Sequence, residues 1–315
     1  MHLAISLRRR CKGRKNVFYT EAQIDRKADK RSDPDFIAMR LSNPETMLLP
    51  VWRGQNLIDN SGDTPRAGGV TVAEGSMLLA EGGDTVFLGD AEGRAYFAVD
   101  VSSNEEPNGV ADFSERGEFR NLRDVGAAMS QAEGALLAFG RGIFAWHETH
   151  GFCPRCGAPS EMRDGGHRRQ CTSCDASQYP RIDPAVIMLV RRGERVLLGH
   201  NKRRPAKWFS CFAGFVEIGE TLEEAVAREV FEEAGVKTTA VKYFASQPWP
   251  FPSSLMLGYF ADSPDGDPKP DMEEIVETRW FTKDEIRDIE ATEYHLPPPD
   301  SMARQLMTAW VEGYD

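Results

Sequence analysis

The chain has 315 residues, of which 41% are hydrophobic, and a formal net charge of −11 at pH 7. This length accommodates two domains and a small module, and the hydrophobic content suffices for folded cores. The acidic balance argues against a general nucleic-acid-binding surface, and no segment approaches the roughly 18 apolar residues of a membrane span. We therefore expect a cytoplasmic protein with several folded parts.

The first residues of the chain differ from the rest in charge. Six basic residues lie between Arg8 and Lys15, and the first twenty residues include no acidic one. A transit-peptide-like segment, a nucleic-acid-binding arm, a disordered tail and a start codon placed too early all fit this composition. We assign residues 1–18 to a disordered basic extension and give Cys11 no role.

Residues 19–128 have the pattern of a mixed α/β domain. Short β-like runs occupy residues 47–52, 85–88 and 95–101, and Gly-rich turns separate them. Apolar residues then recur at helical spacing over 130–147. We expect a linking helix over residues 129–149.

Four cysteines follow as two Cys-x-x-Cys pairs, separated by 14 residues. They are Cys153, Cys156, Cys171 and Cys174. This spacing is typical of a zinc ribbon, and four thiolates leave no open position on the metal, so the zinc would be structural. His150 and His167 are further candidate ligands, and two disulfides are the alternative, disfavoured in a chain without a secretory signal. We assign residues 150–178 to the ribbon.

Residues 179–315 have the pattern of a sheet held between helices. Apolar runs predict a hairpin over 184–190 and 196–198, strands over 209–213, 238–245, 255–261 and 279–281, and a closing helix over 301–312.

One motif in this region, residues 214–236, is the most informative feature of the chain. Its fixed positions are Gly214, Glu220, Arg228-Glu229-Val230, Glu232-Glu233 and Gly235-Val236. The glutamates at 229, 232 and 233 are spaced i, i+3 and i+4, so they share one helical face and repel one another unless a cation binds. Such oxygen clusters bind hard cations such as Mg²⁺, which also hold phosphate oxygens. A solvated acidic face is the alternative for an isolated ExxEE pattern.

A second motif, Ser-Gln-Pro-Trp-Pro-Phe-Pro-Ser-Ser, occupies residues 246–254. Its prolines restrict the backbone, and we expect a stiff loop that holds out Trp249 and Phe251 for stacking on a flat ring. Taken alone, the pattern is equally typical of a polyproline-like surface loop.

The two motifs and the cysteine pairs resemble those of the NADH pyrophosphatase branch of the Nudix hydrolase family. The Leu-Pro-Val-Trp-Arg-Gly stretch at 49–54 is similar to the N-terminal domain of that branch, so the resemblance covers most of the chain. It implies an α/β fold: a Nudix α/β/α sandwich with a mixed sheet, preceded by a zinc ribbon and a mixed α/β N-terminal domain. It also implies a homodimer, one zinc per subunit, and two or three Mg²⁺ or Mn²⁺ ions per site.

The resemblance further implies site residues, position by position. Catalytic residues would be Glu229, Glu232, Glu233 and Glu274, with Glu232 our choice for the general base. The Mg²⁺ or Mn²⁺ ligands would be the carbonyl of Ala213 with Glu229, Glu233 and Glu274, Glu273 being the alternative to the last. Substrate-binding residues would be Tyr179, Phe215, Gln247, Pro248, Trp249, Pro250, Phe251, Pro252, Ser253, Ser254 and Ala303. Structural roles fall to Gly214 and to an ion pair of Glu220 with Arg228. One position departs from the family: some relatives have a glutamate where this chain has Gly166, which puts a substrate contact there in doubt.

The reaction that this resemblance implies is hydrolysis of the pyrophosphate bond of NADH, and less well of NAD⁺, to nicotinamide mononucleotide and AMP. Metal ions would neutralise the phosphates and activate water. The same pocket could accept the NAD cap of an RNA 5′ end, because only the dinucleotide enters it. A non-catalytic regulator that senses nucleotide and binds a partner through the ribbon is the alternative of another class, and the complete set of box glutamates argues against it.

Overall fold

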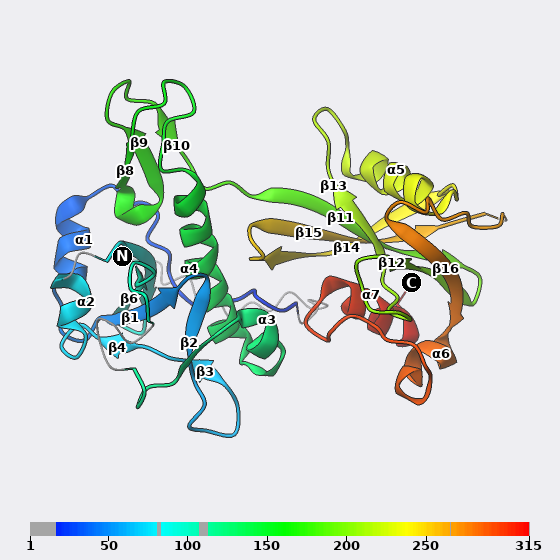
Figure 1. Cartoon of the computed structure of the whole chain (residues 1–315), viewed down its shortest axis with the longest axis horizontal. Coiled ribbons are helices and arrows are strands. Elements are labelled where there is room, and N and C mark those ends of the chain that lie inside the picture. The colour runs from blue at the N-terminus through cyan, green and yellow to red at the C-terminus, as the bar shows by residue number, and fades with distance from the viewer. Residues whose placement is uncertain (1–16, 81–82, 107–112, 265, 315) are drawn as a thin grey trace, which may run out of the picture.

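The computed structural model describes residues 17–80, 83–106, 113–264 and 266–314. An N-terminal α/β domain and a C-terminal α/β domain lie side by side, and the long helix α4 (Gln131–Thr149) leads from the first into the zinc ribbon (Figure 1). Cys11 and residues 1–16 of the expected extension lie outside the described residues. The structure differs from the expectation at Val17, which is 7% exposed and packs into the core of the C-terminal domain. No helix in the described ranges is both long and apolar enough to cross a membrane.

A seven-stranded sheet organises the N-terminal domain. Its strands are β1 (Met47–Trp52), β2 (Gln55–Asp59), β3 (Arg66–Ala67), β4 (Val70–Thr71), β5 (Thr85–Ala91), β6 (Arg94–Asp100) and β7 (Glu118–Arg120). The order is β3-β2-β1-β6-β5, with β4 paired to β1 and β7 to β2. Alternation along β1 sends Leu49 and Val51 to one face and Leu48 to the other, so both faces are apolar and both are covered.

Helices cover the two faces of this sheet. Helix α4 and the short α3 (Leu122–Val125) pack on one face, and α1 (Pro34–Leu41) and α2 (Ser76–Ala80) contribute apolar side chains to the other. The linking helix was expected at 129–149, and α4 occupies almost that span. The sequence pattern did not reveal α1, because none of its residues is buried and its apolar stripe is weak.

The zinc ribbon stands at the end of α4 (Figure 1). Its three short strands are β8 (Ser160–Arg163), β9 (Arg168–Cys171) and β10 (Ser177–Gln178), in the order β10-β9-β8. The turn that joins β8 to β9 rests on the N-terminal sheet: a side chain on Gly166, whose φ is +90°, would collide with Val86. The glutamate of some relatives would therefore not fit here without a backbone change.

The C-terminal domain is the expected α/β/α sandwich. Its strands are β11 (Asp183–Arg192), β12 (Arg195–Asn201), β13 (Phe212–Phe215), β14 (Ala240–Trp249), β15 (Ser254–Asp262) and β16 (Ile275–Thr282), and its helices are α5 (Leu222–Ala234), α6 (Lys283–Arg287) and α7 (Met302–Val311). The strand order is β14-β15-β11-β12-β16, with β13 paired to β11. Strands β11 and β15 run parallel and the other pairs run antiparallel, so the sheet is mixed.

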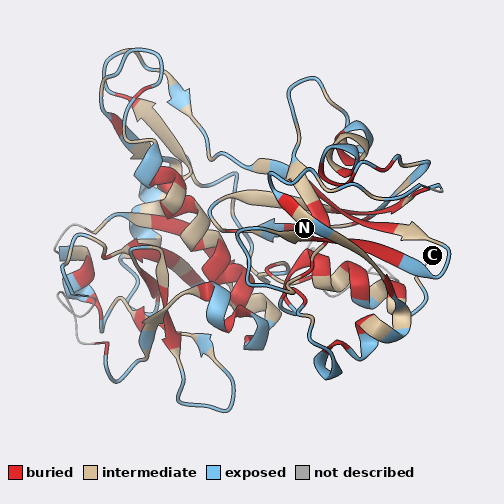
Figure 2. Cartoon of the chain, turned by 45° about the vertical axis from the view of Figure 1, so that its right-hand side comes forward, coloured by how far each residue is buried: buried red, intermediate tan, exposed pale blue. Residues whose placement is uncertain are grey.

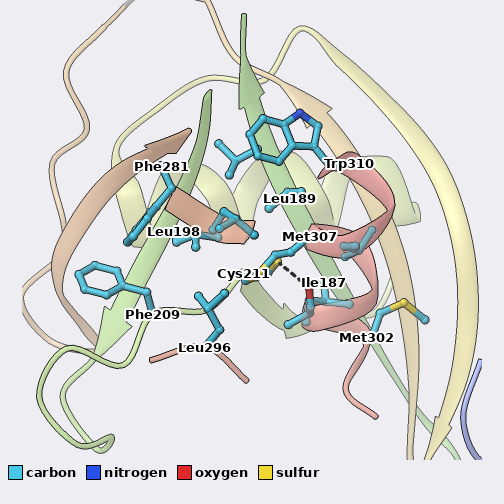
Figure 3. Packing of buried hydrophobic residues seen from close by; sticks show 14 of the residues in the cluster. Ile187, Leu189, Leu198, Phe209, Cys211, Phe281, Leu296, Met302, Met307 and Trp310 are labelled. Atoms are coloured by element: carbon cyan, nitrogen blue, oxygen red, sulfur yellow. Dashed lines mark hydrogen bonds between the residues drawn. The ribbon is translucent and has the colours of Figure 1, made fainter. Parts of the chain in front are cut away.

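Period-2 alternation along β11 builds the two cores of the sandwich. Val186, Met188 and Val190 face α5, whereas Ile187 and Leu189 face α7. Figure 3 shows the second core, where Met302, Met307 and Trp310 of α7 meet strand residues around Cys211. Buried residues follow the sheet and the inner faces of the helices (Figure 2).

Two strand boundaries differ from the expectation. The strand predicted at 209–213 is β13, Phe212–Phe215, because Phe209 and Ser210 lie in a preceding loop, where Ser210 forms an isolated bridge to Gly199 and Phe209 bonds to His295. Strand β14 runs on through Trp249, so residues 246–249 are strand and not loop. Pro248 is tolerated there because β14 is the edge strand of the sheet.

Candidate active site

Helix α5 carries the box glutamates and is fixed at both ends. Thr221 caps its N-terminus by accepting from the backbone N–H of Glu224, and the Glu224 carboxylate accepts in return from Thr221. Gly235 ends the helix with φ of +66°. These two capping residues therefore fix both ends of the helix. They set the rotation of the helix, with Val226 and Val230 buried on the sheet and the glutamates at one edge.

Arg228 is the cation at the centre of this acidic group. Its Nε and Nη2 donate to the two carboxylate oxygens of Glu220 at 2.8 and 2.9 Å. Its Nη1 donates to Glu229 at 2.7 Å and to Glu232 at 3.1 Å, and Nη2 also reaches the carbonyl of Phe215 at 3.0 Å. The hydrogen bonds from Arg228 hold the pKa of Glu220 below its ordinary value. Arg228 thus ties the loop before α5 to the helix.

Strand β13 passes very close to the helix at Gly214. A methyl group on Gly214 would overlap the carboxylate of Glu229, so only glycine fits between β13 and that side chain. Burial raises the pKa of Glu229, and hydrogen bonding from Arg228 opposes that rise. The box glycine therefore brings the backbone of β13 against a box carboxylate.

Glu233 is the buried member of the cluster. It is 7% exposed, and burial, followed by the charges of Glu229 and Glu274, raises its pKa to about 8. Its Oε2 has no hydrogen-bond partner among the described residues. A buried carboxylate oxygen without a partner, beside two further carboxylates, is a site that a cation would complete.

Glu274 approaches this group from the start of β16. Its Oε1 accepts from the Asn201 amide at 2.8 Å, and its charge acts on Glu233. Among the described residues, the four cysteines are the group of metal-ligating side chains whose ligand atoms lie within 4.8 Å of one another. The carboxylates are not part of a group with that spacing; Glu229 is bonded to Arg228, and Glu274 to Asn201.

A cavity of about 700 Å³ adjoins Glu233 and Glu274. It extends between the sheet of the C-terminal domain, the start of α7 and α3 of the N-terminal domain. Its wall includes Ala213, Gln247, Trp249 and Ala303 of the predicted site residues. The volume falls in the range of organic-ligand sites, and the carboxylates lie at one part of its wall.

The second motif contributes to this wall differently from the expectation. Trp249 and Phe251 are not held out into solvent: their rings pack on each other at 5.0 Å and each meets the edge of Tyr19 at 6.0 Å. The guanidinium of Arg123 lies 4.0 Å from the centre of the Phe251 ring. The motif packs against the N-terminal domain because these aromatic surfaces are large and apolar.

Several predicted substrate-binding residues lie outside the cavity wall. Tyr179 and Phe215 are 66% and 61% exposed, and neither lines the cavity. The remaining members of the motif that do not line it are Pro248, Pro250, Phe251, Pro252, Ser253 and Ser254. Their roles in substrate binding stay predictions.

The four cysteines form one compact group in the ribbon. Sγ of Cys153 lies 3.7 Å from that of Cys174, and Sγ of Cys156 lies 3.5 Å from that of Cys171. These spacings suit a tetrahedral zinc site and exclude S–S bonds. His150 and His167 do not belong to this group; Nδ1 of His150 bonds to the carbonyl of Trp146, and Nε2 of His167 bonds to that of Phe87.

Sequence reasoning missed the cationic and acidic residues that line the cavity from distant segments. They are Arg123, Arg203, Arg204 and Asp300. The run Asn201-Lys202-Arg203-Arg204 was visible as a basic patch and was a usable signal. Nothing in the sequence marks Arg123 or Asp300: α3 brings Arg123 to the cavity from the N-terminal domain, and Asp300 lies there just before α7.

Comparisons with known proteins agree with this architecture. Residues 181–304 match the NUDIX domain, residues 45–146 the NADH pyrophosphatase-like rudimentary NUDIX domain, and residues 148–179 the NADH pyrophosphatase zinc ribbon domain. The chain is 32% identical over 337 aligned residues to NAD-capped RNA hydrolase NUDT12 of Homo sapiens. The aligned region covers 93% of this chain and 73% of that protein.

Two further relatives come from a plant and a bacterium. Nudix hydrolase 19, chloroplastic, of Arabidopsis thaliana is 36% identical over 78% of this chain and 62% of its own length. NAD-capped RNA hydrolase NudC of Vibrio vulnificus is 39% identical over 58% of this chain and 69% of its own length. With its matched domains, four-cysteine ribbon and box helix, this chain belongs to the Nudix hydrolase family, in the zinc-ribbon branch of NADH pyrophosphatases.

Proposed function

We propose that this protein hydrolyses the pyrophosphate bond of NADH, and of NAD⁺, to nicotinamide mononucleotide and AMP. The observation that carries the proposal is the buried, unpartnered oxygen of Glu233 beside Glu229 and Glu274, at the wall of a cavity large enough for much of a dinucleotide. The branch to which the chain belongs and the names of its relatives support the same substrate class.

Glu229, Glu233, Glu274 and the carbonyl of Ala213 would hold Mg²⁺ or Mn²⁺. Hard cations prefer such oxygen donors, and bound there they would neutralise the phosphates and lower the pKa of water. Arg228 would fix the orientation of Glu229, because it bonds that side chain and Glu220 together. Glu232 is 58% exposed and bonded to Arg228, and we propose it as the group that accepts a proton from the attacking water.

The remaining residues would bind and orient the substrate. Trp249 offers part of an apolar wall, while Arg123, Arg203 and Arg204 line the same cavity and would attract the negatively charged substrate. Zinc in the ribbon would keep its structural role, apart from the chemistry.

Removal of the NAD cap from RNA is the second candidate function. It is favoured by two observations: relatives in two kingdoms are named NAD-capped RNA hydrolases, and Lys202, Arg203 and Arg204 form an exposed basic run at the cavity. Such a run could contact RNA phosphates next to the cap. The net negative charge of the whole chain had argued against a nucleic-acid-binding surface and gave no sign of this local basic run.

Product chromatography tests both candidates. Purified protein with Mg²⁺ or Mn²⁺ is given NADH, NAD⁺, ADP-ribose and NAD-capped RNA, with Glu229→Gln as the matched inactive control. Fastest release of AMP and reduced nicotinamide mononucleotide from NADH supports the first function. A preference for capped RNA that is lost in the double variant Arg203→Ala, Arg204→Ala supports the second function. Cleavage of none of the four contradicts both and favours a regulator.

The family resemblance also implies a homodimer with the cavity near the interface. The exposed rings of Tyr179 and Phe215 support this proposal, because a second copy could cover them. Sedimentation velocity at micromolar protein tests it, and a monomer at all concentrations would contradict it.

A further inference from the structure

Two acceptor oxygens in the cavity wall have no role in the reaction proposed above. Asp300 and Gln247 both line the cavity, and they are 1% and 0% exposed. Within the described part of the chain, Asp300 Oδ1 and Gln247 Oε1 have no hydrogen-bond partner. Buried acceptors without partners are rare in folded proteins, because leaving them unpaired costs stability, so a pair of them at a binding cavity points to a ligand.

The hydrogen bonds around the pair fix which atoms remain free. Gln247 Nε2 donates to the carbonyls of Asp300 at 2.7 Å and of Phe18 at 3.4 Å. Carbonyls only accept, so the amide nitrogen must face them and Oε1 is left as an acceptor. The hydroxyl of Tyr19 donates to Asp300 Oδ2 at 2.5 Å, which leaves Oδ1.

The side chains around the hydrogen bond between Tyr19 and Asp300 are tightly packed. Tyr19 is 3% exposed, and a methyl group on Gly126 would overlap its hydroxyl. Burial, followed by the hydrogen bond to Asp300, raises the pKa of Tyr19, so its hydroxyl keeps its proton and remains a donor. Tyr19 thus holds Asp300 in one orientation just before the start of α7.

The chemistry of the pair selects its partner. A carboxylate oxygen and an amide oxygen accept hydrogen bonds and repel other acceptors and anions. Phosphate is excluded by these charges, and a hydroxyl offers only one hydrogen. A primary –NH₂ group offers two hydrogens to two acceptors, and a nicotinamide adenine dinucleotide carries one on each base, as the 6-amino group of adenine and the carboxamide of nicotinamide.

We propose that Asp300 and Gln247 form an acceptor pair that receives an –NH₂ group of the dinucleotide and selects substrates by that group. The proposal rests on the proposed function and adds a specificity determinant to it. Asp300 contacts the substrate in this account, and Tyr19 is a positioning residue.

Two deaminated analogues test the pair and distinguish the two bases. Nicotinamide hypoxanthine dinucleotide replaces the amino group of adenine by an oxygen, and nicotinic acid adenine dinucleotide replaces the carboxamide by a carboxylate. We expect the wild type to cleave one of them with kcat/KM about tenfold or more below that for NAD⁺, because the oxygen would face two acceptors. The analogue that is rejected identifies the base at the pair.

Asp300→Asn supplies the decisive variant. Its amide can still accept from Tyr19 and would present N–H in place of Oδ1, so the preference against the rejected analogue should fall about tenfold or reverse. Tyr19→Phe should raise KM for NAD⁺ with kcat retained, because the acceptor is no longer held in place. Asp63→Asn, on an exposed loop, is the matched control and should change neither ratio.

Equal cleavage of all three dinucleotides by the wild type would overturn the proposal and indicate that the two oxygens are merely hydrated. A loss in Asp300→Asn that is equal for all three would overturn it as well. If the wild type cleaves none of them, the proposed function fails, and equilibrium binding measured by tryptophan fluorescence decides the inference separately. Weaker binding of one deaminated analogue than of NAD⁺, with the difference reduced in Asp300→Asn, supports the acceptor pair. Equal binding of all three dinucleotides contradicts it.

Discussion

Glu233 is predicted to destabilise the fold when its metal is absent. The folded protein holds the Glu233 proton up to about pH 8, whereas an unfolded glutamate loses it near its ordinary value of 4.5. Between these pH values the native state binds more protons than the unfolded state, so stability falls as pH rises. Each pH unit in this window costs about 1.4 kcal/mol, which gives a penalty of about 3 kcal/mol at pH 7 from this one carboxyl group.

Glu233→Gln removes the charge and keeps the shape. At pH 5 the two proteins should be about equally stable, because both side chains are neutral there. At pH 7 to 8, without Mg²⁺ or Mn²⁺, the variant should be the more stable, by a melting-temperature difference on the order of 5–10 °C. Adding Mn²⁺ should stabilise the wild type more than the variant, because the variant lacks one of the carboxylate ligands.

Differential scanning fluorimetry from pH 5 to 8 measures this effect. The protein is dialysed free of Mg²⁺ and Mn²⁺ without a chelator, so that the ribbon keeps its zinc, and zinc content is checked. Glu232→Gln, on the exposed side of the same helix, is the matched control and should show no pH-dependent gain. A difference in melting temperature between Glu233→Gln and wild type that does not change with pH would show that Glu233 does not titrate in this way.

Three further variants probe the ribbon, strand β13 at the start of the box, and the box helix. Cys156→Ser should lose zinc and lower the melting temperature, and a stable variant with full zinc content would contradict the ribbon assignment. Gly214→Ala should lower kcat by about 100-fold with little change in melting temperature, because the added methyl displaces the carboxylate of Glu229; near-normal steady-state kinetics would argue against that contact. Thr221→Ala should cost about 1 kcal/mol in urea unfolding by removing the capping box with Glu224, and no change in stability would mean that the cap is not formed in solution.

Local patterns in the sequence predicted much of the fold. The i, i+3 and i+4 spacing of the box glutamates predicted the helix that carries them, and the apolar run at 184–190 predicted the strand that the structure shows as β11. The four cysteines predicted the ribbon because their spacing alone suits a tetrahedral metal. These features depend on interactions between residues close in sequence.

The parts that escaped prediction depend on packing between distant segments. Prolines at 248 and 250 argued for a loop, yet the edge position of β14 lets the strand include Pro248. Val17 looked like part of a basic tail, and the C-terminal core buries it. Asp300 sits at the cavity through a hydrogen bond with a residue 281 positions away, a pairing that no local pattern encodes.

Turnover of NADH by wild type and by Glu229→Gln, followed by chromatography of the products, shows whether the box glutamates carry a metal-dependent hydrolysis. We expect AMP and reduced nicotinamide mononucleotide from the wild type only, strictly dependent on added Mg²⁺ or Mn²⁺, with the variant folded and zinc-loaded. Near-normal hydrolysis by Glu229→Gln, or hydrolysis by the wild type without any added divalent metal, would contradict it.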